Sequence, residues 1–364
     1  MARVILHIHS LEGGGAERVW AILASGLAGR GHECLFVVER VDDANRPFLD
    51  SRVPYKVLAA SSHVAQVAEM AALWRHTQPH VVLTACGNAN LKAALVRAGG
   101  QRKPGLIISI HGAVASGILG RAGLKLFPLV ARIADRVVYN SWGMRALMER
   151  RWFVPQANGC VINNPVWFPA CVDPGECERL YPSLAGRRLI LSIGRLHVDQ
   201  KGQDDLLKAF ARFAQTDPNY DLVLVGDGPS RTALQSLARE LGVGARVHFM
   251  GYSQDPWPFY AGAAILAHCA RHEAFGNVLV EALGYGLPIV ATDTPGAREV
   301  LAGGIFGRLV PIGDVDGITR GLHDALQSQP DSARLKRRAA EFAPARAIEQ
   351  YDRLIGELIN ERGY

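Results

Sequence analysis

Short apolar segments alternate with alanine- and leucine-rich segments along most of the chain. The apolar segments are rich in β-branched residues, as buried strands are, and the segments between them have helical spacing. Strands this apolar, separated by helices, indicate a parallel sheet that is covered on both faces. In the first half, the pattern predicts a helix over 16–30 and strands over 3–9, 33–39, 80–84, 105–111, 136–140 and 159–163.

The alternation pauses between residues 164 and 183, where four prolines and two cysteines occur without periodicity. It then predicts strands over 188–194, 221–226, 246–251, 263–268, 288–292 and 307–310. The expected fold class is α/β, with two doubly wound parallel-sheet domains that bind ligands at the carboxyl ends of their strands and in the cleft between them. We place the first domain at 1–165, a linker at 166–185, the second domain at 186–345 and a C-terminal helix at 346–364.

Composition and charge narrow the class of protein. The 364 residues are 49% apolar and 20% charged, which excludes a disordered chain, a collagen-like fibre and a coiled coil. The six scattered cysteines and the absence of a signal-peptide pattern indicate a cytoplasmic protein. Residues 1–185 contain 20 Lys and Arg against 13 Asp and Glu, a balance of +7, whereas residues 186–364 contain 20 against 21, a balance of −1. The basic half favours an anionic partner, unless the asymmetry is chance.

The strongest chemical signal is the segment 272–283, which follows a predicted strand and opens a helix. At the start of this helix the backbone N–H groups of residues 276–278 would be free donors, a good site for phosphate. Glu273 and Glu281 flank these donors, and carboxylates accept hydrogen bonds from the hydroxyl groups of a ribose or a sugar. A capping glutamate and a surface glutamate would have the same spacing.

Two cations follow the predicted strand over 188–194. Arg195 comes directly after Gly194, and Lys201 stands at the start of the next helix. Such a pair suits a diphosphate, which Arg grips through two nitrogens and Lys attracts as a point charge. A solvent-exposed Arg and Lys on an ordinary turn would give the same sequence pattern. Gly226 lies in another strand-to-helix turn, which is low enough for a nucleotide to lie across it.

In the first half, Gly14 and Gly15 belong to a triple-glycine loop that exposes backbone N–H groups to a phosphate or an acceptor. Arg18 stands where the dinucleotide-binding fingerprint has its third glycine, which argues against a nicotinamide cofactor. His111 follows a strand end, where it could present its ring to a substrate, although a lone histidine is more often structural.

The segment 117–136 places four cations on one side of a helical wheel and apolar residues on the other; the cations are Arg121, Lys125, Arg132 and Arg136. An interfacial helix and an ordinary helix that covers a sheet both have this pattern, and we favour the ordinary helix. We predict no metal site, and there is no P-loop and no G-x-S-x-G elbow. No basic helix with interleaved aromatics indicates nucleic acid.

Four motifs together have a familiar form: EAFGNVLVEAL at 273–283, GR-x5-KG at 194–202, GDGP at 226–229 and GGGAERV at 13–19. In their order along the chain, and each at a strand end, they resemble the retaining glycosyltransferases of the GT-B group, family four (group 1). The resemblance extends from residue 11 to about residue 350. It implies two facing Rossmann-like domains with a cleft between them, and a last helix that often crosses back to the first domain.

The same resemblance implies a hexosyltransferase that retains the anomeric configuration. Its donor would be a nucleotide-diphosphate sugar, with UDP favoured, and its acceptor a glycan or a lipid-linked precursor of lipopolysaccharide or another cell-surface polysaccharide. No metal ion or other cofactor is expected, and no nucleic acid. Peripheral contact with the anionic inner face of the membrane would fit the basic half.

On the matching positions, Arg195 and Lys201 would hold the diphosphate, while Glu281 would bind the ribose and Glu273 the donor sugar. The resemblance therefore implies a catalytic set of His111, Glu273, Arg195 and Lys201. It implies a nucleotide-sugar site of Gly14, Gly15, Gly194, Arg195, Lys201, Gly226, Phe275, Gly276, Asn277, Val278 and Glu281.

Three alternatives remain at this point. A sugar-nucleotide 2-epimerase of the same fold would need acid and base residues that we cannot assign. An NAD-dependent oxidoreductase is disfavoured by Arg18 in the glycine loop. A binding protein that has lost catalysis is disfavoured by the intact charged residues, Arg195 and Lys201 among them.

Overall fold

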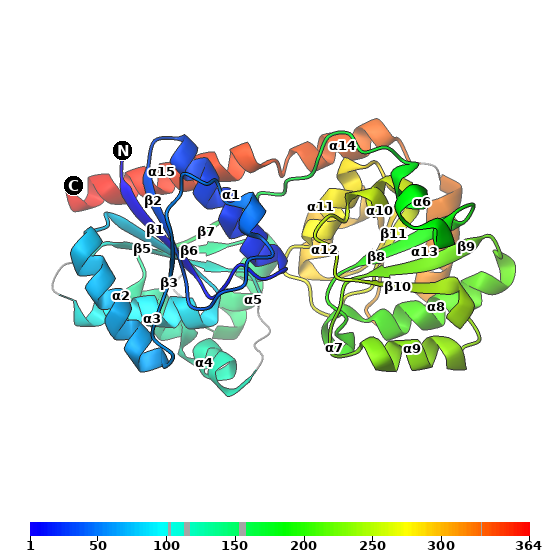
Figure 1. Cartoon of the computed structure of the whole chain (residues 1–364), viewed down its shortest axis with the longest axis horizontal. Helices are drawn as coiled ribbons and strands as arrows, with labels where there is room; N and C mark the ends of the chain where they lie inside the picture. Colours follow the sequence, from blue (N-terminus) through cyan, green and yellow to red (C-terminus); the bar gives the residue numbers. More distant parts are fainter. Residues whose placement is uncertain (101–102, 113–116, 153–157, 329) are drawn as a thin grey trace. The chain divides into compact units, whose positions relative to one another are not determined.

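The computed structural model describes residues 1–100, 103–112, 117–152, 158–328 and 330–364, without the side chains of residues 117–124 and 151–152. The chain forms two compact units (Figure 1). Unit 1 comprises Met1–Pro165 and Ala343–Tyr364, and unit 2 comprises Val166–Phe342. Each unit is built around one sheet whose paired strands are parallel.

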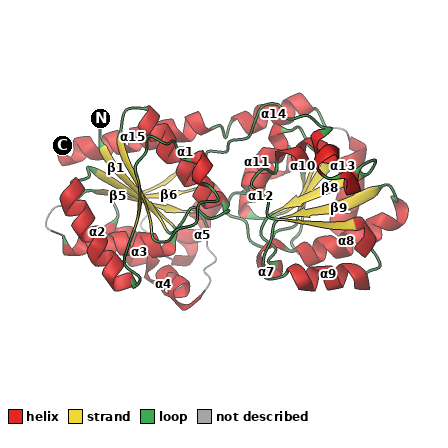
Figure 2. Cartoon of the chain, in the orientation of Figure 1, coloured by secondary structure: helices red, strands yellow, loops and turns green. Residues whose placement is uncertain are grey.

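Unit 1 has a seven-stranded sheet with the order β3-β2-β1-β4-β5-β6-β7. Helices α1 and α15 lie on one face, and α2, α3 and α4 lie on the other (Figure 2). The strands are β1 (Arg3–Ile8), β2 (Glu33–Val38), β3 (Tyr55–Val57), β4 (Val81–Ala85), β5 (Gly105–Ile110), β6 (Arg136–Tyr139) and β7 (Gly159–Val161). The helices are α1 (Gly15–Gly29), α2 (His63–Thr77), α3 (Gly87–Gly99), α4 (Gly117–Ile133), α5 (Trp142–Trp152) and α15 (Pro344–Arg362), with a short 3₁₀ helix η1 (Arg46–Phe48).

Unit 2 has a six-stranded sheet with the order β10-β9-β8-β11-β12-β13, which repeats the strand order of the first six strands of unit 1. The strands are β8 (Arg188–Ile193), β9 (Tyr220–Val225), β10 (Val247–Gly251), β11 (Ala263–His268), β12 (Ile289–Thr292) and β13 (Arg308–Val310). The α-helices are α6 (Glu176–Leu180), α7 (Val198–Lys201), α8 (Gln203–Thr216), α9 (Arg231–Glu240), α10 (Trp257–Gly262), α11 (Asn277–Gly284), α12 (Pro295–Val300), α13 (Val315–Ser328) and α14 (Ser332–Ala340). Three 3₁₀ helices complete the unit: η3 (Pro182–Leu184), η4 (Gly244–Arg246) and η5 (Ala302–Gly304).

Burial on both faces explains the uninterrupted apolar strands. In β8, Leu189 and Leu191 join one core of unit 2, which includes residues of α11 and α12. Ile190 joins the other core, with residues of α8 and α13. Because successive side chains of a strand point to opposite faces, consecutive positions in the middle of such a strand are apolar rather than alternating. The predicted fold class is confirmed.

Local signals mark several helix starts. The Ser62 side chain accepts a hydrogen bond from the N–H of Ala65 and caps α2. Thr294 caps α12 in the same way, with Pro295 at the first helical position. Asp331 caps α14 by accepting from two backbone N–H groups. These side chains satisfy donors that a helix start leaves unpaired.

One prediction about organisation is corrected, and one strand is absent from the predicted elements. The segment 166–185 is not a free linker, because Val166, Cys177 and Leu184 are buried in the core of unit 2. These apolar residues fill the core without a regular spacing, so their burial left no periodic signal. The edge strand β3 was not predicted either, since three residues around Lys56 are too short to show an alternation.

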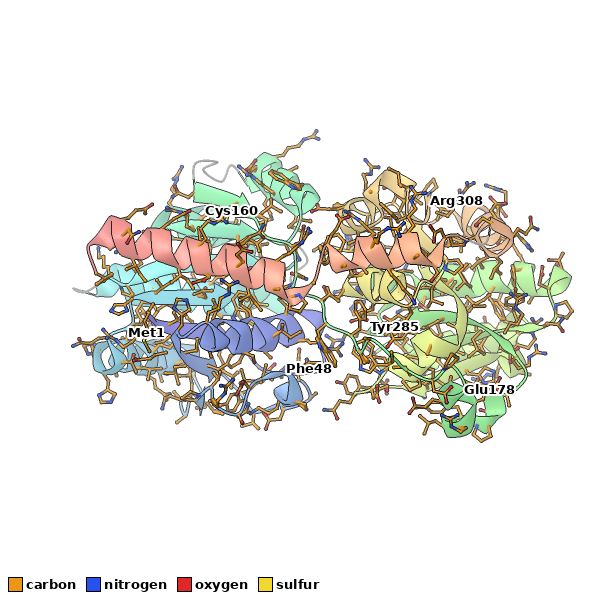
Figure 3. All side chains as sticks on the ribbon, turned by 90° about the horizontal axis from the view of Figure 1, so that it is seen from above. Met1, Phe48, Cys160, Glu178, Tyr285 and Arg308 are labelled. Atoms are coloured by element: carbon orange, nitrogen blue, oxygen red, sulfur yellow. The ribbon has the colours of Figure 1, made fainter. Side chains whose placement is uncertain are left out.

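The C-terminal helix α15 is part of unit 1. It runs beside α1, and Tyr351, Ile355 and Leu358 are buried in the unit 1 core (Figure 3). Asp352 forms ion pairs with Arg30 at 2.8 Å and with His32 at 2.8 Å. The last segment of the chain therefore completes the hydrophobic core that its first strands begin.

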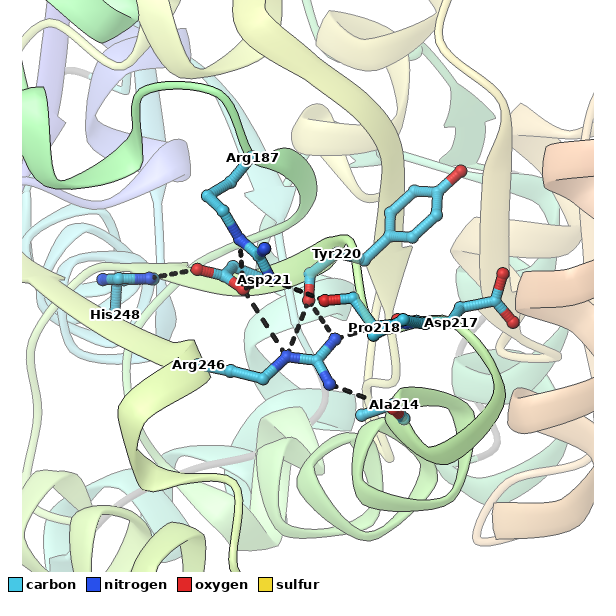
Figure 4. Close-up of polar contacts among 8 residues, drawn as sticks. All are labelled: Arg187, Ala214, Asp217, Pro218, Tyr220, Asp221, Arg246 and His248. Carbon is cyan, nitrogen blue, oxygen red and sulfur yellow. Dashed lines mark hydrogen bonds and ion pairs between the residues drawn. The ribbon is translucent and has the colours of Figure 1, made fainter.

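Asp221, near the start of β9, connects three segments of unit 2 (Figure 4). Its carboxylate accepts hydrogen bonds from Arg187 at 2.7 Å and from His248 at 2.8 Å. Arg246, 3.6 Å from the same carboxylate, also donates to the carbonyl oxygens of Ala214 and Asp217. This network lies at the amino end of the sheet, opposite the edge where such sheets bind ligands, so we assign it to stability.

Among the described residues, no helix combines the length and the apolar character that crossing a membrane requires.

Candidate active site

Unit 2 brings two predicted charged residues together at the carboxyl edge of its sheet. The strand order reverses between β8 and β11, which is where doubly wound sheets bind ligands. Lys201, at the end of α7, follows β8, and Glu273 follows β11. Nζ of Lys201 lies 2.6 Å from Oε2 of Glu273, a direct contact that the spacing did not predict.

His268 is a third member of this group, and the sequence analysis missed it. It is the last residue of β11, and its Nε2 donates a hydrogen bond of 3.0 Å to the same oxygen of Glu273. Its position at a strand end, five residues before Glu273, was the available signal. One carboxylate oxygen thus receives two donors.

The charge of Glu273 is fixed by these partners. Burial alone would favour the neutral acid, but the positive charge of Lys201 and the hydrogen bond from His268 hold the pKa of Glu273 well below its usual range. The carboxylate is therefore ionised at every physiological pH and acts only as an acceptor. Such a group suits the hydroxyl groups of a sugar.

Arg195 is placed differently from Lys201. Its backbone carbonyl accepts a hydrogen bond from Nε2 of the buried Gln203 at 2.8 Å, which fixes the main chain after Gly194. Its side chain is exposed, and no ion pair to another described residue holds the guanidinium. Arg195 thus offers an unpaired cation directly after Gly194, whose added Cβ would lie 4.0 Å from Cε of Lys201. Lys201 has three donors and commits one of them to Glu273.

Two glycines allow the loops of the site to approach closely. At Gly226 (φ +137) an added Cβ would lie 2.1 Å from the carbonyl oxygen of Gly194. At Gly202 (φ +59) it would lie 2.1 Å from the carbonyl oxygen of Cys269. Both positions also have a backbone conformation that favours glycine. Gly194 and Gly226, both predicted site residues, therefore touch through their backbones.

The loop after β11 is held against α7 and α8. Arg271 pairs with Asp204 at 2.9 Å and with Asp205 at 2.5 Å, and its N–H donates to the carbonyl oxygen of Gln200 at 2.9 Å. These contacts fix the segment between His268 and Glu273. They keep the carboxylate of Glu273 beside Lys201.

The predicted anion site is the first turn of α11. Gly276 (φ +92) precedes this helix, and no side chain caps it. Asn277 and Val278 begin the helix, so their N–H groups lie where the helix dipole attracts an anion. The Phe275 side chain, in contrast, is 1% exposed and packs edge-on against Phe342, so only its backbone is available to a ligand.

Glu281 lies one turn into α11 and is 4% exposed. Its Oε2 accepts a hydrogen bond of 2.5 Å from the hydroxyl of Tyr260 in α10. Tyr260 is fully buried and stacks on Tyr285, with ring centroids 5.6 Å apart. This tyrosine could not be recognised as a site residue from the sequence, because its partner lies 21 residues away and the segment around it resembles an ordinary apolar core helix.

In unit 1, Gly14 and Gly15 begin α1 after the carboxyl end of β1. Nδ2 of Asn45, a buried residue, donates to the carbonyl oxygen of Gly14 at 3.0 Å. The Glu17 carboxylate packs against Gly14 and lies 3.4 Å from Nε2 of His9. Burial raises the pKa of Glu17, although the nearby His9 opposes this rise. The loop is thus held from two sides.

His111 directly follows β5, as predicted, and lies in the same unit as this loop. Its Nε2 is 3.0 Å from Oγ of Ser109, and its ring meets Trp20 edge-on with centroids 5.3 Å apart. Burial lowers the pKa of His111 to about 4, against an opposing hydrogen bond with Asn164. The ring is therefore neutral at physiological pH.

One group of described residues could hold a metal ion: His9, Glu12 and Glu17 in unit 1. The part of unit 2 that the structure describes contains no such group. The residues around Lys201 and Glu273 instead form a charged, hydrogen-bonding site of the kind that binds phosphate and sugar hydroxyl groups.

The exposed surface of α4 differs from the predicted one. Lys125 and Arg132 are exposed as expected, but Arg136 is the first residue of β6 rather than part of the helix, and its guanidinium is paired with Glu361 of α15. The side chain of Arg121 lies outside the described residues. Leu126 is 43% exposed and Leu129 is 55% exposed, because Phe127 and Val130 take the buried positions.

Comparison with known proteins decides the family. The model of glycosyltransferase family 4 matches residues 13–166, and that of glycosyl transferases group 1 matches residues 181–342. The chain belongs to the family 4 (group 1) glycosyltransferases. Neither match favours the epimerase or the oxidoreductase.

Curated relatives of this glycosyltransferase include the lipopolysaccharide core biosynthesis glycosyltransferase LpsE of Rhizobium meliloti (strain 1021). It is 35% identical over 153 residues, which are 42% of this chain and 44% of LpsE. A phosphatidyl-myo-inositol mannosyltransferase of Mycolicibacterium smegmatis is 34% identical over 62% of this chain and 54% of its own. The matches span about half the length of these relatives.

The solved structure of Anabaena Alr3699/HepE in complex with UDP and glucose has a TM-score of 0.83 and 21% identity. The alignment covers 98% of the glycosyltransferase described here and all of the Anabaena chain. The lipopolysaccharide outer core galactosyltransferase WaaB, in its apo form, has a TM-score of 0.73 and 19% identity. That alignment covers 98% of this chain and 99% of the WaaB chain. At this identity the likeness shows the fold alone, which is the predicted GT-B fold.

Proposed function

We propose that this glycosyltransferase moves a hexosyl group from a nucleoside-diphosphate sugar, with UDP as the favoured nucleotide, to a glycan or lipid-linked acceptor. The product would be a precursor of lipopolysaccharide or another cell-surface polysaccharide. The observation that carries the proposal is the contact of Lys201 with Glu273, beside the unpaired Arg195 and the uncapped start of α11. The LpsE and mannosyltransferase relatives support the acceptor class.

The charges of unit 2 fit the leaving group. As the bond between the anomeric carbon and the β-phosphate oxygen breaks, negative charge grows on the nucleoside diphosphate. Arg195, the remaining donors of Lys201 and the N-terminal end of α11 stabilise that charge, which is the largest catalytic effect expected of such a site. Glu273 orients the sugar by accepting from its hydroxyl groups, and Glu281 accepts from the ribose.

The reaction retains the anomeric configuration in this proposal. The acceptor oxygen bonds to the anomeric carbon on the face that the leaving group vacates, and the acceptor proton passes to the departing phosphate oxygen. No protein nucleophile takes part. In unit 1, the neutral ring of His111 donates a hydrogen bond to the transferred sugar, and the backbone at Gly14 and Gly15 contacts phosphate or acceptor. No metal ion is needed, because cationic side chains supply the charge.

We further propose that the protein works in the cytoplasm, at the inner face of the membrane. Lys125 and Arg132 on α4 are exposed beside two exposed leucines, Leu126 and Leu129. Cations attract anionic headgroups, and leucines enter the headgroup boundary. A lipid-linked acceptor lies in that boundary, so this contact would bring the enzyme to its substrate.

Ligand-dependent thermal stability tests the donor class. The protein is heated with UDP, GDP, ADP, CMP or NAD, with magnesium or with EDTA. We expect UDP to raise the melting temperature equally in both buffers, since a ligand at a hundred times its Kd stabilises the folded state by about 2.7 kcal/mol. UDP-hexoses are then tested for transfer, and the anomeric proton coupling of the product reports retention.

A control variant separates binding from transfer. Glu273→Gln removes the charge that faces the sugar but keeps Arg195 and the start of α11, so UDP should still stabilise it while transfer is lost. Stabilisation by NAD alone, or an inverted product, would refute the proposed reaction. Dependence of UDP binding on magnesium would refute the proposed independence of metal ions.

A further inference from the structure

Tyr351 connects the C-terminal helix to the histidine at the end of β5. Its hydroxyl lies 3.4 Å from Oγ of Ser109, and the same Oγ lies 3.0 Å from Nε2 of His111. Tyr351 stands in α15, 242 residues after Ser109 in the chain. All three residues belong to unit 1.

The hydrogen-bonded series Tyr351, Ser109 and His111 is buried and rigidly held. Ser109 is 1% exposed and Tyr351 is 2% exposed. The indole of Trp20 meets the rings of both His111 and Tyr351 edge-on, at 5.3 and 6.3 Å. The next residue of α15, Asp352, is paired with Arg30 and His32. The hydroxyl of Tyr351 is therefore held in one place relative to the strand.

The main chain of Ser109 is fixed as well. Its carbonyl oxygen accepts a hydrogen bond of 3.1 Å from Nδ2 of Asn90, and Oδ1 of Asn90 accepts a hydrogen bond of 2.6 Å from the hydroxyl of Thr84. Both of these residues are buried. The side chain of Ser109 is thus left with Tyr351 and His111 as its hydrogen-bond partners among the described residues.

The direction of the hydrogen bonds from Tyr351 through Ser109 to His111 follows from how few partners each group has. Burial raises the pKa of Tyr351, so its phenol keeps its proton. A buried hydroxyl proton needs an acceptor, and Oγ of Ser109 is the only hydrogen-bond partner of that phenol among the described residues. Ser109 accepts from Tyr351 and directs its own proton to the next acceptor, Nε2 of His111.

We propose that Tyr351 and Ser109 are positioning residues that fix the ring of His111 in the tautomer with its proton on Nδ1. A ring nitrogen that accepts a hydrogen bond carries no proton, so the other nitrogen of a neutral imidazole must carry it. The proton then lies on Nδ1, a buried atom that has no hydrogen-bond partner among the described residues and so keeps a donor for a bound ligand. The C-terminal helix, which belongs to unit 1, thereby sets the tautomer of a site residue in the first half of the sequence.

The effect of this tautomer on catalysis rests on the proposed function. If His111 donates to an oxygen of the transferred sugar, the reversed tautomer would offer a lone pair to that oxygen instead. The attraction between the ring N–H and the sugar oxygen would then be replaced by repulsion between two lone pairs. Removing the phenol hydroxyl frees Ser109 to turn its proton elsewhere, so both tautomers become populated and part of the enzyme is inactive.

The test combines nitrogen NMR with kinetics. The protein is labelled with ¹⁵N-histidine at pH 7.5, and the His111 signals are assigned by their absence in His111→Gln. In the wild type we expect Nδ1 at the position of a protonated nitrogen and Nε2 at that of a bare one. Tyr351→Phe should move both signals toward averaged values and lower kcat about tenfold, the worth of one hydrogen bond to a polar partner. KM for the donor should change little.

Three further variants separate positioning from folding. Ser109→Ala should show the same averaging, and Ser109→Thr, which restores a hydroxyl, should recover the wild-type spectrum. Tyr364→Phe removes another phenol hydroxyl from the C-terminal segment, one bonded to the carbonyl oxygen of Lys103 at 3.5 Å, and should leave the His111 signals unchanged. Melting temperatures verify that each variant is folded.

The outcomes distinguish this proposal from the proposed reaction. Unchanged His111 signals in folded Tyr351→Phe, or Nδ1 found bare in the wild type, overturn the proposal. Averaged His111 signals in Tyr351→Phe support the positioning proposal, whether or not the wild type transfers sugar. A wild type that transfers no sugar would count against the proposed reaction alone. An equal response of Tyr364→Phe overturns it, because the effect would then not pass through Ser109.

Discussion

The ammonium group of Lys201 and the carboxylate of Glu273 are joined at 2.6 Å, although 72 residues separate them in the chain. In the proposed reaction Lys201 binds the diphosphate and Glu273 the sugar, so this contact would connect the two halves of the donor. Its position after β8 and β11 follows from the strand order, which places those two strands side by side.

Replacing Lys201 should affect both of these roles. Lys201→Met removes the main charge that keeps the pKa of Glu273 low, so that pKa should rise toward and above its ordinary range. We expect UDP affinity to fall about 10- to 100-fold, since a hydrogen bond to a charged group contributes about 1.5–3 kcal/mol. Calorimetric titration with UDP measures it.

A double-mutant cycle with Glu273→Gln provides the control. The two changes should be far from additive in stability, because each leaves the charge of a half-buried partner uncompensated. Additive effects would mean that the pair does not interact in solution.

Glu281 should act through the ribose alone. In the wild type we expect UDP to bind more tightly than 2′,3′-dideoxy-UDP, because Glu281 accepts from the ribose hydroxyls. Glu281→Ala should abolish this preference, and Tyr260→Phe, which releases Oε2 of the carboxylate, should reduce it several-fold. Competition binding with the two nucleotides measures the ratio. If Glu281→Ala still prefers UDP over 2′,3′-dideoxy-UDP, another group must bind the ribose hydroxyls.

The sequence was sufficient for the parts of the molecule that have local patterns. Buried strands such as β8 are apolar on both faces along most of their length, and the glycines and charges of the site stand at strand ends, so fold class and motif residues were predictable. Contacts between distant segments were not. Tyr260 and His268 lie in apolar segments that look like ordinary core, and Tyr351 lies on the buried face of the charged helix α15. Only the fold shows that their polar atoms meet Glu281, Glu273 and Ser109.

Gly202→Ala should damage the site through the backbone. The added methyl would meet the carbonyl oxygen of Cys269 at 2.1 Å, so the α7–α8 turn must move away from the loop that carries Glu273. We expect the rate of transfer to fall at least about 100-fold, because a 1 Å misplacement in a site can cost that much. Initial rates at saturating donor measure it.

Gly186→Ala is the matched control for Gly202→Ala. Gly186 also has a positive φ, +70, but nothing lies within 4 Å of its added Cβ. It should cost only the strain of the left-handed backbone, about 1 kcal/mol of stability, with the transfer rate unchanged. Equal rates in the two variants would show that the close approach to Cys269 is unimportant.

The Asp221 network should stabilise unit 2 in a pH-dependent manner. Burial disfavours its charge, but hydrogen bonds from Arg187 and His248 outweigh burial and lower the pKa of Asp221. Because the folded pKa lies below the unfolded value, about 3.9, this stabilisation is present above pH 4 and is lost as the pH falls through the folded pKa. Asp221→Asn should cost about 3 kcal/mol at pH 7, and the difference should shrink below pH 4.

Scanning calorimetry at several pH values tests this difference. Asp173, whose pKa is lowered by the N–H of Gly175 and by Arg179, is an exposed counterpart, and Asp173→Asn should lower the melting temperature little. A loss of stability in Asp221→Asn that persists unchanged at pH 3 would contradict the ionic explanation, since the unfolded wild-type carboxyl would then be mostly protonated and part of the stabilisation would already be lost.

The exposed part of α4 should bind anionic membranes. Each cation near such a surface contributes about 1 kcal/mol, so Lys125→Glu with Arg132→Glu should weaken binding to phosphatidylglycerol vesicles well over tenfold. Added salt should weaken wild-type binding in the same direction. Leu126→Ser with Leu129→Ser should reduce binding while keeping the charge, which separates insertion from attraction. Arg337→Glu, on the exposed part of α14 in unit 2, is the control and should change nothing. Binding that is equal for phosphatidylcholine vesicles, or unaffected by both double variants, would mean that α4 is only a covering helix.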